Sequence, residues 1–166
     1  MAIYVAIYLF LALLGIANWS KGQTRFLTVV VYSSLVLFVG TRLDTGCDFD
    51  TYADRFKLLL PEYTSLSNIT EPGYFLLTSS IKQAGLDFVW VNVVGAAIFF
   101  YYLFKFAGNH PRPLLLIALT FPVLSVQLSM AGIRQALAVA FLMGALDAFF
   151  KGRRAHVVIY ILIGST

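Results

Sequence analysis

Residues 40–52 read GTRLDTGCDFDTY, and this polar stretch follows directly on an apolar run. It holds one arginine, three aspartates and one tyrosine. The chain on either side of it is largely apolar. This pattern predicts that most of the chain serves to hold a polar segment at a membrane surface.

The composition is that of an integral membrane protein. Hydrophobic residues make up 60% of the chain and charged residues 12%, whereas a soluble domain has about 25% charged residues. Basic residues are scattered over short loops, which argues against a nucleic-acid-binding protein. The single cysteine, Cys47, excludes an internal disulfide.

Apolar segments of the length needed to cross a bilayer, about 20 residues, recur along the chain. We predict an all-α integral membrane protein, a polytopic helix bundle in which residues 1–166 form a single transmembrane domain. It should have about five complete spans, a truncated sixth from residue 155 onward, and one short interfacial or re-entrant helix. The predicted complete spans are residues 1–18, 26–40, 86–106, 114–130 with a break at Pro122, and 133–150.

Residues 72–85 have the signals of a short helix. Pro72 suits its first position and Gly85 its end. At 1.5 Å per residue it is about 20 Å long, too short for a hydrocarbon core of about 30 Å. Residues 41–85 therefore read as an external loop that carries this helix.

The loops rich in lysine and arginine predict the orientation, because such loops remain in the cytoplasm. Two predicted spans separate each basic loop from the next, so all three can face the same side. The N-terminus, residues 41–85 and Arg134 then lie outside. The basic loops contain Lys21 and Arg25, then Lys105 and Arg112, then Lys151, Arg153 and Arg154.

Two external arginines are candidate anion ligands. Arg134 lies just inside the start of a helix, where the helix dipole favours an anion, and its planar fork matches phosphate oxygens. It could equally reach lipid headgroups. Arg42 ends the second span, where it could complement the helix C-terminus and pair with Asp44. Together the two arginines favour a clamp for a diphosphate.

Carboxylates and tyrosines of the polar segment are further candidates. Asp44, Asp48 or Glu71 could act as a general base toward a hydroxyl. Tyr52 and Tyr74 could stack on sugar rings or belong to the aromatic belt at the membrane interface.

Two other acidic features have simpler readings. The pair Asp48 and Asp50 resembles the metal-binding aspartates of sugar-nucleotide transferases, but sugar nucleotides are cytoplasmic and this loop is predicted outside. Asp147 lies one helical turn from Lys151, so an ion pair explains it.

Four short blocks follow one another in the chain: RxDxGxDFxxY from Arg42, EPGYFLL from Glu71, FP at Phe121, and IRQALA from Ile133. In this order and spacing they resemble the EpsG family of Wzy-like exopolysaccharide polymerases. Members of that family continue with a block like Phe-His-x-Ser and several more spans. We therefore expect residues 1–166 to be the N-terminal part of a longer polymerase, inactive by itself.

The resemblance implies polymerisation of oligosaccharide repeats linked to undecaprenyl diphosphate, by glycosyl transfer outside the bacterial cytoplasmic membrane, without a metal or a cofactor. Such a protein would work with the bilayer and with polysaccharide export or assembly proteins. A flippase or transporter of lipid-linked sugars, suggested by the break at Pro122, and a non-catalytic membrane partner of an assembly complex remain open. The expected site has Asp44, Asp48 and Glu71 as catalytic residues and Arg42, Arg134, Gln135, Tyr52 and Tyr74 as substrate ligands.

Overall fold

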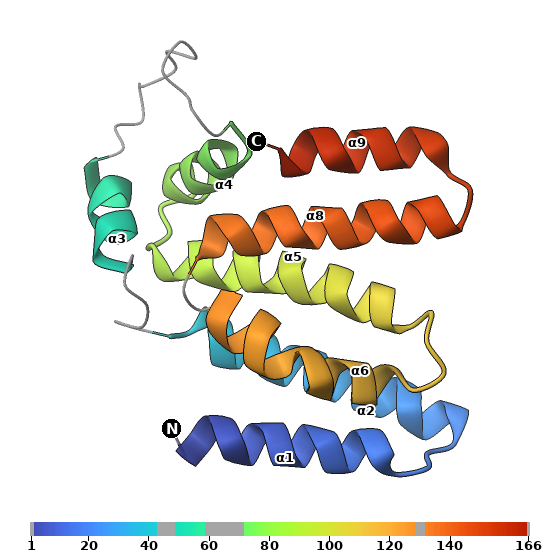
Figure 1. Ribbon diagram of the computed structural model, residues 1–166. Coiled ribbons are helices and arrows are strands. Elements are labelled where there is room, and N and C mark those ends of the chain that lie inside the picture. Colours follow the sequence, from blue (N-terminus) through green and yellow to red (C-terminus); the bar gives the residue numbers. More distant parts are fainter. Residues whose placement is uncertain (1, 43–48, 59–71, 129–131, 166) are drawn as a thin grey trace.

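The computed structural model describes residues 2–42, 49–58, 72–128 and 132–165, and these are helical apart from short connections (Figure 1). The prediction of an all-α fold is confirmed for this part of the chain. The helices are α1 (Ala2–Ile16), α2 (Lys21–Gly40), α3 (Phe49–Leu58), α4 (Pro72–Gln83), α5 (Val89–Ala107), α6 (Pro113–Thr120), the π-helix η2 (Phe121–Leu128), α8 (Ile133–Phe150) and α9 (Arg154–Gly164).

The long helices form a bundle in which α1, α5 and α8 run in one direction and α2, α6 and α9 run in the opposite one (Figure 1). Helix α5 is central and packs against α2, α6 and α8, while α1 packs on α6 and α9 packs on α8. Phe99, Phe100 and Leu103 of α5 are fully buried at the centre of the larger apolar core. Within the described residues, α2, α5 and α8 are long and apolar enough to cross a membrane, and α1, residues 113–128 and α9 are shorter apolar helices.

Helix α2 begins five residues before the predicted span 26–40, so Lys21 and Arg25 lie in its first turns and not in a loop. The helix starts there because Ser20 and Gln23 form a capping box, in which the side chain of each residue hydrogen-bonds to the backbone N–H of the other. The Gln23 backbone N–H donates to the Ser20 hydroxyl at 3.4 Å, and the Ser20 N–H donates to the Gln23 side chain at 3.0 Å. Because this capping box sets the start of α2, the helix includes the charged residues Lys21 and Arg25.

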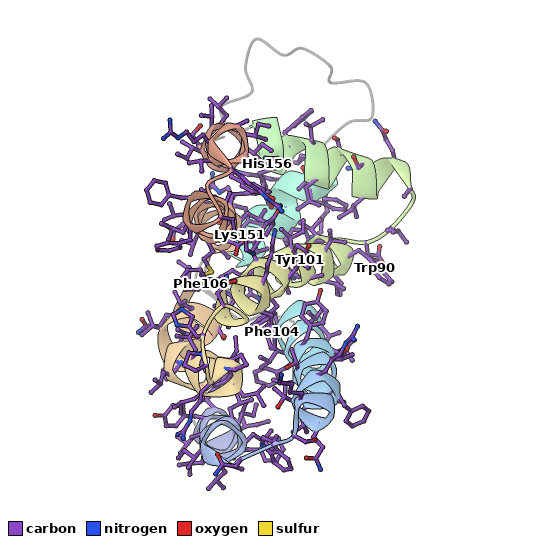
Figure 2. All side chains as sticks on the ribbon, turned by 90° about the vertical axis from the view of Figure 1, so that its right-hand side faces the viewer. Trp90, Tyr101, Phe104, Phe106, Lys151 and His156 are labelled. Atoms are coloured by element: carbon purple, nitrogen blue, oxygen red, sulfur yellow. The ribbon has the colours of Figure 1, made fainter. Side chains whose placement is uncertain are left out.

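Helix α4 confirms the short helix predicted at residues 72–85. Its end is closed at Gly85, which has a positive φ of 71°, a conformation that costs glycine little. The N–H of Gly85 donates to the Lys82 carbonyl, and the N–H of Leu86 donates to that of Ile81, the pattern of a Schellman motif. Helix α4 runs across the bundle and not along it (Figures 1 and 2).

The predicted break at Pro122 is also confirmed. The α-helical winding of α6 ends at Thr120, and the next eight residues wind as a π-helix. Proline has no backbone N–H to donate, so an α-helical ladder cannot pass through it unchanged. The Thr120 hydroxyl donates to the carbonyls of Leu116 and Ile117 just before the change.

Helix α3 lies within residues 41–85, the segment predicted as an external loop with one short helix, and is a second helix that was not predicted there. Tyr52 and Phe56, one turn apart, are buried, whereas Asp54 and Lys57 are exposed and paired with each other. A helix with one apolar stripe gains stability by packing that stripe against neighbours. Here the neighbours come from α4, α5 and α8, and they form a second apolar cluster at this end of the bundle.

Close approach of helix backbones holds the bundle together at glycines. A Cβ atom on Gly40 of α2 would lie 2.7 Å from the Cα of Val93 in α5, and one on Gly15 of α1 would lie 2.5 Å from the Cα of Leu115 in α6. Small residues at helix contacts allow the tight packing that drives association in lipid. Both contacts therefore leave no space for a side chain.

Replacing Gly40 by alanine should destabilise the protein by about 1–3 kcal/mol, because the new methyl group forces α2 away from α5. Gly22→Ala is the matched control in the same helix, since a Cβ atom there meets nothing within 4 Å and alanine favours a helix by about 1 kcal/mol. Unfolding in detergent would be measured for both variants. Equal stabilisation by the two alanines would contradict the proposed contact.

Candidate functional site

Arg134, the second residue of α8, is held by Tyr52 of α3. Its Nε–H donates to the Tyr52 hydroxyl at 2.7 Å, and its Cζ lies 4.9 Å from the centroid of the same ring. One tyrosine therefore makes a hydrogen bond and a cation–π contact to one guanidinium. The two residues are 82 positions apart in the sequence.

Helix α3 reaches this position because Lys82 of α4 binds its C-terminal end. The Lys82 ammonium donates to the carbonyl oxygens of Phe56 at 2.6 Å and of Lys57 at 2.8 Å. It also lies 5.4 Å from the centroid of the Phe56 ring. The last carbonyls of a helix lack intrahelical partners and carry partial negative charge, so a cation there is favourable.

A cavity of about 340 Å³ opens beside Arg134, between α4, α5, α8 and α9. Tyr74, Arg134 and Gln135 supply polar groups to its wall, and the wall continues along α8 as Leu137 and Phe141. A cationic group at the head of an apolar wall suits an amphiphilic anion. The phosphate of such a ligand would meet the arginine while its hydrocarbon lay along the apolar side chains.

Arg42 lies at the same end of the bundle but lines a different and smaller cavity, of about 10 Å³. It shares that cavity with Asn92 of α5 and with Ile133, the residue directly before Arg134. Burial lowers the pKa of Arg42 to about 10, so its guanidinium is still protonated at neutral pH. A diphosphate held by both arginines remains a prediction.

The other predicted ligands divide between the cavity and the protein interior. Tyr74 and Gln135 line the large cavity. Tyr52 is only 7% exposed and packs its ring 5.7 Å from that of Tyr74, so a place in the interfacial belt does not fit it. The predicted catalytic residues Asp44, Asp48 and Glu71 lie outside the described residues.

Two residues close to the site, Lys82 and Asn92, were not predicted from the sequence. Lys82 fixes α3, as described above. Asn92 is 3% exposed, and neither atom of its amide has a hydrogen-bond partner among the described residues. A lone asparagine in an apolar segment is the one signal that could have drawn attention to it.

The opposite end of the bundle, which Figure 2 views end-on, carries a paired acidic residue. Asp147 of α8 accepts from Lys151 at 2.6 Å and from the Asn109 amide at 2.7 Å, and Lys105 of α5 lies 3.7 Å from it. The predicted pair with Lys151 is confirmed. Lys105 also lies 5.9 Å from the Tyr160 ring of α9, so the cluster ties three helices together.

The fold and the site define a class of protein: a polytopic helical membrane protein with a cationic, partly apolar cavity at one end of its bundle. The EpsG family model matches residues 25–166, and the chain belongs to the EpsG family. This membership connects it with exopolysaccharide biosynthesis. No curated protein and no solved structure matches the chain.

Asp147→Asn should lower the free energy of unfolding by about 2 kcal/mol, because two lysines lose a buried counter-charge. The value is below that for a fully buried pair, since the Lys151 side chain is 42% exposed. Asp54→Asn is the control, because its pair with Lys57 is exposed and such pairs add little. If both variants unfolded in detergent like the unchanged protein, the cluster would have no structural role.

Proposed function

We propose that the chain takes part in polymerising lipid-linked oligosaccharide repeats on the outer side of the bacterial cytoplasmic membrane. The observation that carries this is Arg134, fixed by Tyr52 at the head of an apolar cavity. A polyprenyl diphosphate, such as undecaprenyl diphosphate, is an anion with a hydrocarbon tail and matches both parts. Membership in the EpsG family supports the same substrate class.

The size of the cavity fits this assignment. Ligand cavities of about 300–1,000 Å³ enclose molecules of drug size, and about 340 Å³ would hold a diphosphate with the first part of its lipid. The rest of a long polyprenyl chain would remain in the bilayer. The sugars, being polar, would extend from Arg134 toward the end of the bundle where α3 and α4 lie (Figure 1).

The reaction would be a glycosyl transfer. A hydroxyl oxygen of one lipid-linked repeat attacks the anomeric carbon of the growing glycan, and the bond from that carbon to the lipid diphosphate breaks. The hydroxyl proton passes to a base, for which we propose Asp44, Asp48 or Glu71. Arg134 would stabilise the charge on the departing diphosphate, as fixed cations do in a dry site.

Arg42 would assist from the neighbouring cavity. Its guanidinium is buried and protonated at neutral pH, and charges interact strongly where water is excluded. Tyr74 and Gln135, on the wall of the large cavity, would contact the sugar next to the diphosphate. Export or assembly proteins of the polysaccharide pathway are the partners that this function requires.

The orientation that we propose places the end with Lys105 and Lys151 in the cytoplasm and the end with Arg134 outside. It follows the rule that lysine and arginine accumulate in cytoplasmic loops. With α1 and residues 113–128 counted as crossings beside α2, α5 and α8, the chain has five spans, α9 begins a sixth, and its N-terminus is external. Helix α4, which lies across the bundle, would rest at the outer interface (Figure 1).

One feature favours transport of the lipid-linked sugar as a second candidate function. Residues Phe121–Leu128 form a π-helix directly after α6, and such winding is frequent at functional sites. A defective transporter should accumulate the lipid-linked repeat on the inner leaflet. A defective polymerase should instead leave single repeats exported to the outer surface.

Arg134→Lys should shorten the polymer to one or a few repeats, because lysine cannot donate two parallel hydrogen bonds to a phosphate. We expect the rate of polymerisation to fall about 100-fold, the loss typical of one transition-state donor. Polymer length would be measured by gel electrophoresis in cells that make the protein from its natural locus. Arg55→Lys, an exposed arginine of α3, is the control, and long polymer in both variants would overturn the role of Arg134.

A further inference from the structure

We propose that Tyr52 and Lys82 are positioning residues for Arg134. Lys82 holds α3 in place, α3 presents Tyr52, and Tyr52 fixes the guanidinium. The proposal rests on the proposed function of Arg134 as the ligand of a diphosphate. It assigns no substrate contact to either positioning residue.

The first step is the geometry at Arg134. A hydrogen bond from Nε at 2.7 Å fixes one edge of the guanidinium, and the ring 4.9 Å from Cζ fixes the face on which it rests. Because Nε already donates to Tyr52, a phosphate that approaches Arg134 would meet the Nη atoms. Tyr52 thus selects which side of the guanidinium fork a ligand meets.

The second step is that Tyr52 is occupied within the protein. The residue is 7% exposed, and its ring packs beside that of Tyr74 at 5.7 Å. Its hydroxyl is used by Arg134. A sugar therefore has little access to the Tyr52 ring, and we reassign Tyr52 from stacking on the substrate to orienting the arginine.

The third step is that α3 needs an anchor. A helix of ten residues is marginal by itself, because isolated helices shorter than about 12–15 residues are unstable in water. Phe56 packs against Phe88, with ring centroids 5.7 Å apart, and Lys82 binds the last carbonyls of the helix. Lys82 therefore controls the position of Tyr52, one helical turn from Phe56, without reaching the cavity itself.

The experiment measures polymerisation by the purified full-length protein in lipid nanodiscs. The substrate is the organism's own lipid-linked repeat, isolated from cells that lack polymerase activity. Tyr52→Phe keeps the ring beneath Arg134 and removes the hydroxyl, and Lys82→Met keeps the length of the side chain and removes its donors. We expect each to lower kcat about tenfold and to change KM less than threefold, since a loosely held group loses alignment before it loses affinity.

Matched controls come from the same chain. Tyr101→Phe removes the hydroxyl of an exposed tyrosine whose ring also lies beside a lysine, at 5.9 Å. Lys57→Met removes an exposed lysine of α3 that pairs only at the surface. Both controls should keep the unchanged kcat. Lys82→Arg, which restores a cation with several donors, should recover at least half of the rate lost in Lys82→Met, a rescue that simple loss of folding would not show.

The outcomes separate this inference from the proposed function. If Arg134→Lys is defective while Tyr52→Phe and Lys82→Met work at the rate of the controls, the positioning roles are wrong and the function of Arg134 stands. If Arg134→Lys itself polymerises normally, the proposed function and this inference fall together. If Lys82→Met does not fold, the comparison of kcat between Tyr52→Phe and Tyr101→Phe tests the positioning role of Tyr52, and Lys82→Arg against the unchanged protein tests that of Lys82.

Discussion

The structure depends on how closely its helices approach one another. In lipid, apolar surfaces gain little from meeting each other, so helices associate through tight packing. A Cβ atom on Gly15, Gly40 or Gly144 would meet the facing helix at 2.5–2.8 Å, and these contacts join α1 to α6, α2 to α5, and α8 to α5. Since α5 takes part in two of them, it fixes α2 and α8 relative to one another. The end of α2, with Arg42, and the start of α8, with Arg134, are placed as a consequence.

Much of this fold could be predicted from the sequence, because long apolar runs indicate helices directly. The helices at Val89–Ala107 and Ile133–Phe150 lie within a few residues of their predictions, and Gly85 and Pro122 act as expected. Helix α3 could not be found by the length of an apolar run, because it is short and charged on one side. Its signal is the spacing of Tyr52 and Phe56, which is visible in the sequence but becomes meaningful only beside α4 and α8.

The site was predictable where local signals suffice. Arg134 and Gln135 follow a helix start, Tyr74 belongs to the first turn of a short helix, and all three line one cavity. The contact between Tyr52 and Arg134 joins residues 82 positions apart, and no local pattern encodes it. The contact of Lys82 with α3 likewise depends on how α4 crosses the bundle. Arg42 is buried and lines the small cavity together with Asn92, and its role as a diphosphate ligand stays a prediction.

The first turn of α8 contributes to the walls of two cavities, the one that Arg42 lines and the one that Arg134 lines. Ile133 lines the small cavity with Arg42, and Arg134, the next residue, lines the large one. Consecutive residues of an α-helix point about 100° apart, because one turn takes 3.6 residues, so a single backbone segment forms a wall of both cavities. A Cβ atom on Gly95 would lie 3.1 Å from the Ile133 side chain, which leaves that turn little freedom against α5. A displacement of α8 that widened one cavity would therefore alter the other.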